Sequence, residues 1–128
     1  MILVDTDVLI DLEDELDDAM EWLEEANATD VVGCVGFSVL EVLEGAVSKR
    51  QIEYQRQRLA MFTVIWPSEN TMQGVLEFWC GVKTRGGLGW PDALIGCTAL
   101  AAGLPLHTFN DRHFRDVTGL RTVRPYNR

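Results

Sequence analysis

The feature that most constrains this chain is an apolar run at its start that ends at a carboxylate. Residues 2–4 are continuously apolar and lead directly into Asp5. Such a run is typical of a strand buried on both faces of a parallel sheet. Thr6 and Asp7 are then suited to cap a helix that begins at Val8. Because ligands bind at the carboxyl edge of open α/β sheets, the sequence predicts that Asp5 lies at a binding edge.

A second junction between a strand and a helix carries a second acid. Residues 31–37 form a short apolar run, and Ser38 is expected to start a helix that continues to about residue 49. Ser38 and Glu41 have the spacing of a capping box. Glu41 is therefore either a helix cap or a carboxylate that faces the same sheet edge as Asp5, and its two oxygens allow both roles.

Two segments nearer the end of the chain add further polar groups. Residues 91–103 predict a buried helix that is apolar nearly all round and has Asp92 as its only charge. Asp92 either complements the helix dipole or lines a cleft beside the glycine-rich loop that precedes it. Residues 104–109 predict a strand, and Asn110 and Asp111 follow its end. Polar side chains thus recur at the carboxyl ends of predicted strands.

The predicted elements alternate between strands and helices along the chain. The remaining ones are an amphipathic helix over residues 13–27, a helix over 51–62, a strand over 63–66, a helix capped by Ser68, a short helix around Phe114 and Val117, and an edge strand over 120–123. This alternation predicts an α/β fold in three layers, with a central parallel sheet of about five strands and helices on both faces. A length of 128 residues fits one domain over residues 1–128.

Charge and cysteine content limit the class of protein. The net charge is −9, yet residues 1–30 hold twelve acids and no Lys or Arg. An acidic chain binds nucleic acid poorly without a local basic rim, and its acidic surface suits a basic partner. No apolar run approaches the ~20 residues of a membrane span, and no basic segment of a signal peptide opens the chain. Three widely spaced cysteines in apolar surroundings indicate buried thiols and a cytoplasmic location.

The acids at the predicted edge suggest a metal site. Several carboxylates at one edge repel each other unless a divalent cation neutralises them. A set of oxygen ligands without His or Cys favours Mg²⁺ or Mn²⁺, and such ions serve the hydrolysis of phosphate esters. His107 and His113 have no partner at metal-binding spacing, so we expect both to be ordinary surface or packing residues.

Four motifs in this order resemble those of PIN-domain ribonucleases, and most closely the VapC toxins of type II toxin–antitoxin pairs. The resemblance spans the whole chain. The motifs are Leu3-Val4-Asp5-Thr6-Asp7-Val8-Leu9-Ile10, Ser38-x-x-Glu41-x-x-x-Gly45, Pro91-Asp92-Ala93-Leu94-Ile95 and Thr108-x-Asn110-x-x-His113-Phe114.

The resemblance implies a PIN-like fold and a Mg²⁺- or Mn²⁺-dependent endoribonuclease that is usually a homodimer and is inhibited by a cognate antitoxin. Asp5, Glu41 and Asp92 would form the acidic triad, in which Asp5 and Asp92 hold the ion and Glu41 orients or deprotonates the attacking water. The fourth family position, often Asp, is Asn110 here, and the neighbouring Asp111 is a possible substitute. Asp7 stands where the family often has Asn.

Further side chains are candidates for contact with RNA. Lys83 and Arg85 flank the glycine-rich loop over residues 83–90, which is either a helix end and linker or a lid that contacts phosphate. The full set of candidate substrate contacts is Thr6, Asp7, Thr108, Lys83, Arg85, Arg112 and Arg115. Trp22 and Trp66 are expected to be exposed aromatic residues that favour a homodimer.

Two other functions fit parts of the same pattern. An apolar run before Asp5-x-Asp7 also resembles haloacid-dehalogenase-type phosphatases, in which Asp5 would be the nucleophile and Asp7 an acid. That alternative leaves Glu41 and Asp92 without roles. The other alternative is a catalytically decayed domain that binds RNA or a protein partner. Asn110, in place of an acid, and the negative net charge would suit such a domain.

Overall fold

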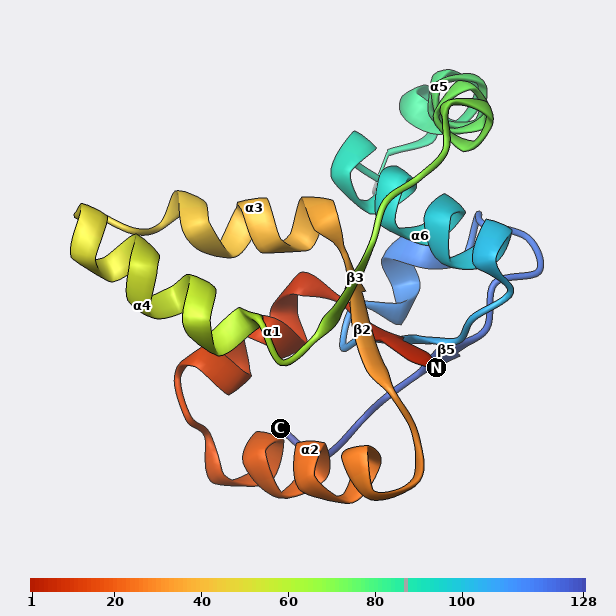
Figure 1. Ribbon diagram of the computed structural model, residues 1–128. Helices are drawn as coiled ribbons and strands as arrows, with labels where there is room; N and C mark the ends of the chain where they lie inside the picture. The colour runs from red at the N-terminus through yellow and green to blue at the C-terminus, as the bar shows by residue number, and fades with distance from the viewer. Residues whose placement is uncertain (87) are drawn as a thin grey trace.

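A five-stranded, wholly parallel sheet forms the centre of the protein. The computed structural model describes residues 1–86 and 88–128, so Gly87 of the predicted glycine-rich loop lies outside the described residues. The strand order is β3-β2-β1-β4-β5, which places β1 in the middle. Figure 1 shows β1 in red, directly after the N-terminus. The strands are β1 (Ile2–Val4), β2 (Val32–Val35), β3 (Thr63–Ile65), β4 (Leu106–His107) and β5 (Thr122–Val123).

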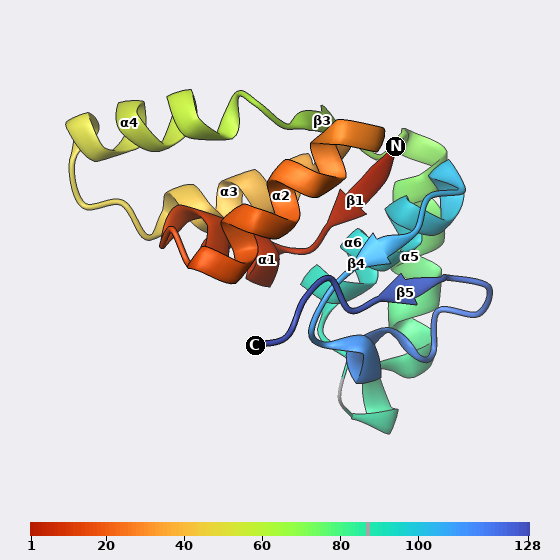
Figure 2. The ribbon, with the colours of Figure 1, turned by 90° about the horizontal axis from the view of Figure 1, so that it is seen from below.

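Helices cover both faces of this sheet and give the three predicted layers. They are α1 (Thr6–Glu13), α2 (Asp17–Thr29), α3 (Gly36–Glu44), α4 (Lys49–Leu59), α5 (Glu69–Val82) and α6 (Trp90–Ala102), with short 3-10 turns η1 (Lys83–Arg85) and η2 (Asp111–Phe114). Figure 2 shows α1 to α4 grouped on one side of β1 and α5 and α6 on the other. The predicted α/β architecture with a parallel sheet is confirmed.

The alternation of β1 side chains explains the two cores. Leu3 packs with Ile95 and Phe114 on the side of α5 and α6, whereas the next residue, Val4, packs with Leu9 on the side of α1 and α2. Successive side chains of a strand face opposite sides of its sheet, so a strand in the middle needs apolar residues at every position. This is why the opening of the chain is continuously apolar up to Asp5.

The pairing register brings distant segments to one edge. Val4 is the register partner of Cys34 in β2 and of His107 in β4. Asp5 directly follows Val4, and Thr108 directly follows His107. The carboxyl ends of parallel strands lie at the same edge, so α1, α3 and the turn after β4 all start there.

The first helix differs from its predicted form. It begins at Thr6, and Asp5 itself is the N-cap, since its side chain accepts a hydrogen bond from the Thr6 amide. The predicted helix over residues 13–27 is interrupted, because Glu15 adopts a left-handed conformation (φ 55°) between α1 and α2. Residues other than glycine rarely adopt such a conformation, so helical periodicity alone does not reveal the break.

The predicted start of the next helix at Ser38 is also wrong. α3 begins at Gly36, directly after β2, and Ser38 is fully buried inside it without a hydrogen-bond partner for its hydroxyl in the described part of the chain. The helix ends at Glu44, and α4 starts separately after its cap Ser48. The capping-box role of Glu41 is therefore not realised, which leaves its carboxylate available for other contacts.

Several other local predictions are confirmed. Ser68 caps α5 by accepting from the Thr71 amide, and Gly103 ends α6 in a left-handed conformation (φ 69°).

All three cysteines are free, but Cys80 is exposed, so the expectation of buried thiols is wrong for that residue. Among the helices of residues 1–86 and 88–128, none has the length and apolar character needed to cross a membrane.

Candidate functional site

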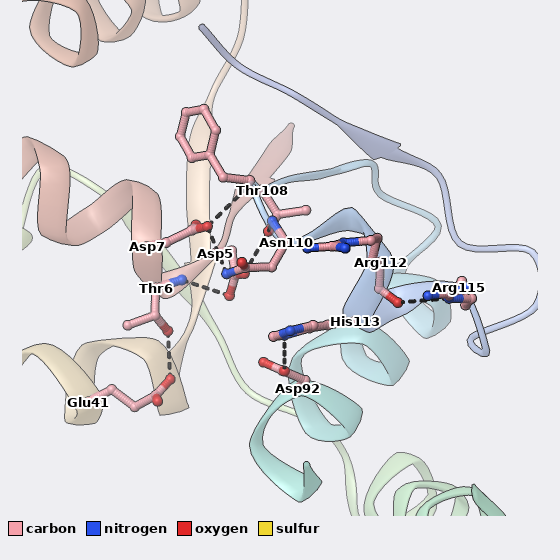
Figure 3. A network of polar contacts seen from close by, with 11 residues as sticks. Asp5, Thr6, Asp7, Glu41, Asp92, Thr108, Asn110, Arg112, His113 and Arg115 are labelled. Carbon is pink, nitrogen blue, oxygen red and sulfur yellow. Dashed lines mark hydrogen bonds and ion pairs between the residues drawn. The ribbon is translucent and has the colours of Figure 1, made fainter. Parts of the chain in front are cut away.

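Asp5 is a buried carboxylate at the centre of the sheet edge. The residue is only 3% exposed. One oxygen accepts from the Thr6 amide at 2.8 Å and the other from the Thr108 hydroxyl at 2.8 Å (Figure 3). Burial, followed by the negative charge of Asp7, raises the pKa of Asp5 to about 7, and Asp92 contributes in the same direction. Asp5 is thus a carboxylate whose charge lacks a compensating cation within the described protein.

Asp7 connects α1 to the turn that follows β4. Its Oδ1 accepts from the Val8 amide at 2.8 Å, and its Oδ2 accepts from the Phe109 amide at 3.0 Å and from Nδ2 of Asn110 at 3.1 Å. Burial is the main cause that raises the pKa of Asp7. Asp7 and Asn110, both predicted as site residues, are therefore brought together by direct hydrogen bonds.

Glu41 reaches the edge from α3. Its Oε1 accepts a hydrogen bond of 2.6 Å from the Thr6 hydroxyl on α1. Thr6 thus links the first and second predicted acids, because its amide binds Asp5 and its hydroxyl binds Glu41. Burial raises the pKa of Glu41, and the charge of Asp92 adds to this effect. The two carboxylates therefore lie in one electrostatic field with Asp92.

Asp92 lies in the first turn of α6 and contacts His113, which was not expected to take part in the site. Its Oδ2 lies 3.0 Å from Nδ1 of His113. The expectation that His113 is an ordinary surface or packing residue therefore needs correction. His113 lies in η2, three residues after Asn110, and its amide donates to the Asn110 carbonyl. The sequence did carry a signal for His113, which is its place in the motif from Thr108 to Phe114. A search for metal-binding spacing misses this residue, because it contacts a single acid and has no second ligand nearby in the sequence.

The other predicted site residues are all exposed. Asp111 is exposed at the start of η2, and Arg115 donates to the Arg112 carbonyl at 3.2 Å on the same side of the site (Figure 3). Lys83 lies over the Trp79 ring, and Arg85 is exposed in η1. In the described residues, none of these cations forms an ion pair with Asp5, Glu41 or Asp92.

The arrangement of the acids bears on metal binding. Within residues 1–86 and 88–128, no group of three or more His, Cys, Asp or Glu side chains is close enough to hold an ion together. Mg²⁺, however, usually keeps several waters and binds one or two protein carboxylates directly. An all-oxygen set in which Asp92 raises the pKa of both Asp5 and Glu41 fits such an ion. That Asp5, Glu41 and Asp92 bind a metal ion stays a prediction.

The comparisons with known proteins concern the family and the fold. A toxin–antitoxin complex from Klebsiella pneumoniae contains a chain 30% identical to this one, with full coverage of both chains and a TM-score of 0.75. VapBC2 from Rickettsia felis, bound to a DNA fragment from its promoter, matches at 20% identity and a TM-score of 0.80, over 96% of this chain and 98% of that chain.

FitAcB from Neisseria gonorrhoeae matches at 21% identity and a TM-score of 0.73, over 98% of both chains. The likeness to this complex and to VapBC2 concerns the fold alone. No curated protein matches the chain. The family model described as the PIN domain matches residues 2–120, which includes every candidate acid. This protein therefore belongs to the PIN-domain family.

Proposed function

We propose that this protein is an endoribonuclease that depends on Mg²⁺ or Mn²⁺. The observation that carries the proposal is the state of Asp5, which is buried and has its pKa raised to about 7, with the charge of Asp92 on α6 contributing to that shift and Thr6 linking it to Glu41 on α3. Burying acids near each other is costly, so proteins keep such groups mainly where the charges serve a function. A cation that neutralises them would also bind a negatively charged phosphodiester.

PIN domains generally use divalent metal ions. Asp5 and Asp92 would hold the ion here, and Glu41 would reach it directly or through water. When bound, the metal would neutralise the carboxylates and stabilise the negative charge that develops on the phosphate. Its oxygen ligands favour Mg²⁺ or Mn²⁺ over softer ions.

The protein's own side chains orient the reacting groups. The Thr108 hydroxyl and the Thr6 amide fix both oxygens of Asp5, so this carboxylate keeps one orientation. The Thr6 hydroxyl binds Oε1 of Glu41, which leaves Oε2 to orient the attacking water and accept its proton. Asn110 is the fourth site residue in this proposal, and Arg112 and Arg115 are the cations best placed for the RNA backbone (Figure 3).

The biological setting is proposed from the neighbours. The Klebsiella pneumoniae chain is part of a toxin–antitoxin complex, and we propose that this protein is likewise a toxin with a cognate antitoxin. Residues 1–128 would act as one domain in a homodimer. The three free cysteines suit a reducing cytoplasm. A basic antitoxin side chain that reaches Asp5 and Asp92 would take the place of the cation.

The proposal is tested by RNA cleavage with the purified protein and a matched pair of variants. Asp92→Asn removes one charge from the site, and Glu24→Gln removes one from the exposed face of α2. We expect the wild type and Glu24→Gln to cleave RNA when Mg²⁺ or Mn²⁺ is added, and Asp92→Asn to lose this activity while its circular dichroism is unchanged. Equal cleavage by Asp92→Asn would refute the assigned site, and no cleavage by the wild type would favour the decayed binding domain.

The phosphatase alternative finds no supporting contact. That mechanism needs Asp7 as a free acid, yet both its oxygens accept hydrogen bonds, from Val8, Phe109 and Asn110. A trapped aspartyl-phosphate on Asp5 would support the phosphatase. Metal-dependent RNA cleavage without such an intermediate would contradict it.

A further inference from the structure

A second buried acid on α1 has no part in the proposed chemistry. Asp11 is 3% exposed. Its Oδ2 accepts a hydrogen bond of 2.7 Å from the Tyr126 hydroxyl, and its Oδ1 forms an ion pair of 3.1 Å with Arg128. A buried carboxylate that loses such partners is costly, so Asp11 holds the C-terminal segment firmly against α1.

The same C-terminal segment encloses the ring of Phe109. The guanidinium groups of Arg124 and Arg128 lie 5.1 Å and 4.7 Å from the centre of this ring, and the Tyr126 ring packs against it edge-on at 4.9 Å. The Tyr126 ring also packs against the ring of Trp22 in α2, and the two ring centres are 6.1 Å apart. Figure 1 shows the end of the chain lying beside α2, after it has crossed from β5.

Phe109 in turn belongs to the turn that supplies the site. Its amide donates to Asp7, while the neighbouring Thr108 hydroxyl donates to Asp5 and Asn110 donates to Asp7. Asp7 and Asp11 are four residues apart on α1 and therefore lie on one helix face. One acid binds the turn and the other binds the segment that packs over this turn. The contacts close a ring through α1, residues 108–110 and residues 124–128.

We propose that residues 124–128 form a clasp that positions the turn 108–110 against α1, with Arg128 and Tyr126 as positioning residues for the site. The inference rests on the proposed function for its effect on catalysis, but its structural part does not. The clasp keeps Thr108 and Asn110 in register with the acids of α1. Without it, the hydrogen bonds to Asp5 and Asp7 would open more often.

The clasp is tested with Arg128→Gln, combined with Tyr126→Phe, and with Arg121→Gln as the matched control. Arg121 is an exposed arginine at the other end of β5, outside the clasp and outside the site. Amide hydrogen exchange at Phe109 and Asn110 is measured in the full-length protein, together with kcat and KM for RNA cleavage. Arg128→Lys, which keeps the charge, serves as the rescue variant.

We expect the double variant, which loses both contacts to Asp11, to exchange the Phe109 amide at least about tenfold faster, since a single hydrogen bond to a charged group already contributes about that factor. We expect kcat to fall with little change in KM, Arg121→Gln to behave as the wild type, and Arg128→Lys to restore part of both effects. Unchanged exchange and unchanged kcat in the double variant would overturn the clasp. If the wild type fails to cleave RNA, the proposed function falls, and the exchange measurement still decides whether the clasp exists.

Discussion

At the scale of single residues, Asp5 shows the balance of forces that defines the site. Burial disfavours its charge, and the hydrogen bonds from Thr6 and Thr108 compensate only in part, so the pKa of Asp5 stays at about 7. Asp7 and Glu41 have pKa values shifted in the same direction. Near neutral pH, the folded protein without metal therefore carries an electrostatic cost at this edge.

This cost predicts how stability depends on pH. Because the pKa of Asp5 is higher in the folded state than in the unfolded chain, the folded state binds the proton more tightly, and stability falls as the pH rises through about 7. In EDTA, we expect the free energy of unfolding to fall by up to about 1.4 kcal/mol per pH unit between about pH 5 and pH 7. Urea unfolding at several pH values measures this slope.

The Asp5→Asn variant provides the control for this prediction. It keeps the shape of the side chain but has no proton to lose and therefore gains no charge, so we expect a shallower slope and greater stability than the wild type at about pH 8 in EDTA. Added Mg²⁺ should stabilise the wild type at that pH and leave the variant unchanged. An equal slope in both proteins would show that the Asp5 carboxyl does not carry the cost.

At the scale of elements, α1 organises the polar contacts of the molecule. In eight residues it carries Thr6, which binds Glu41; Asp7, which binds the turn after β4; and Asp11, which binds the C-terminal clasp. Its C-terminal end is held by Arg58 of α4, which donates to the Leu12 carbonyl at 3.1 Å and pairs with Glu15 at 2.8 Å. The position of α1 thus depends on contacts at both of its ends.

Replacement of Arg58 tests how much the second contact matters. Arg58→Met keeps the aliphatic part of the side chain but leaves the Leu12 carbonyl and the left-handed Glu15 without this partner. We expect the free energy of unfolding to fall by about 1–2 kcal/mol, the low end for a hydrogen bond to a charged group, because the pair with the exposed Glu15 is screened by solvent. Urea unfolding of Arg58→Met beside Arg56→Met, which changes an exposed arginine of the same helix, measures the loss. Equal stability of the two variants would contradict this role.

At the scale of the whole molecule, the edge strand β3 leaves an apolar surface. Trp66 follows this strand and is 65% exposed, and Val64 within the strand is also exposed. Trp66 lies over Gly36, where a β-carbon would overlap its ring. By contrast, Trp22 is half-buried against His107 and Tyr126, so the expectation of an exposed ring is wrong for that residue. An exposed Trp beside an unpaired strand edge is suited to a contact between two copies of the chain.

Trp66→Glu tests this surface as the proposed dimer contact. We expect the dimer dissociation constant to rise by at least about tenfold, since large buried aromatic residues carry much of the energy of an interface. Sedimentation velocity over a range of concentrations measures it, with Ile52→Glu on α4 as the control. Unchanged self-association of Trp66→Glu would place any dimer contact elsewhere on the molecule.

The parts of this structure that the sequence predicts are those set by local pattern. The apolar run that ends at Asp5 predicts the central strand, and the alternation of strands and helices predicts the parallel sheet. The left-handed conformation of Glu15 and the start of α3 at Gly36 cannot be predicted in this way, because tertiary packing competes with the backbone preferences of these residues and decides the outcome. The pairs Asp92–His113 and Asp11–Arg128 are contacts between residues far apart in the chain, which only the folded structure brings together.

The measurement that tests the central claim most directly is RNA cleavage by the wild type and Asp5→Asn, each with Mn²⁺ and with EDTA. The account predicts that the wild type cleaves with Mn²⁺ and stops with EDTA. It also predicts that Asp5→Asn, although folded, is slower by at least about a hundredfold, a loss typical of removing one charge-stabilising group. Cleavage by Asp5→Asn at the wild-type rate, or wild-type cleavage that persists in EDTA, would contradict it.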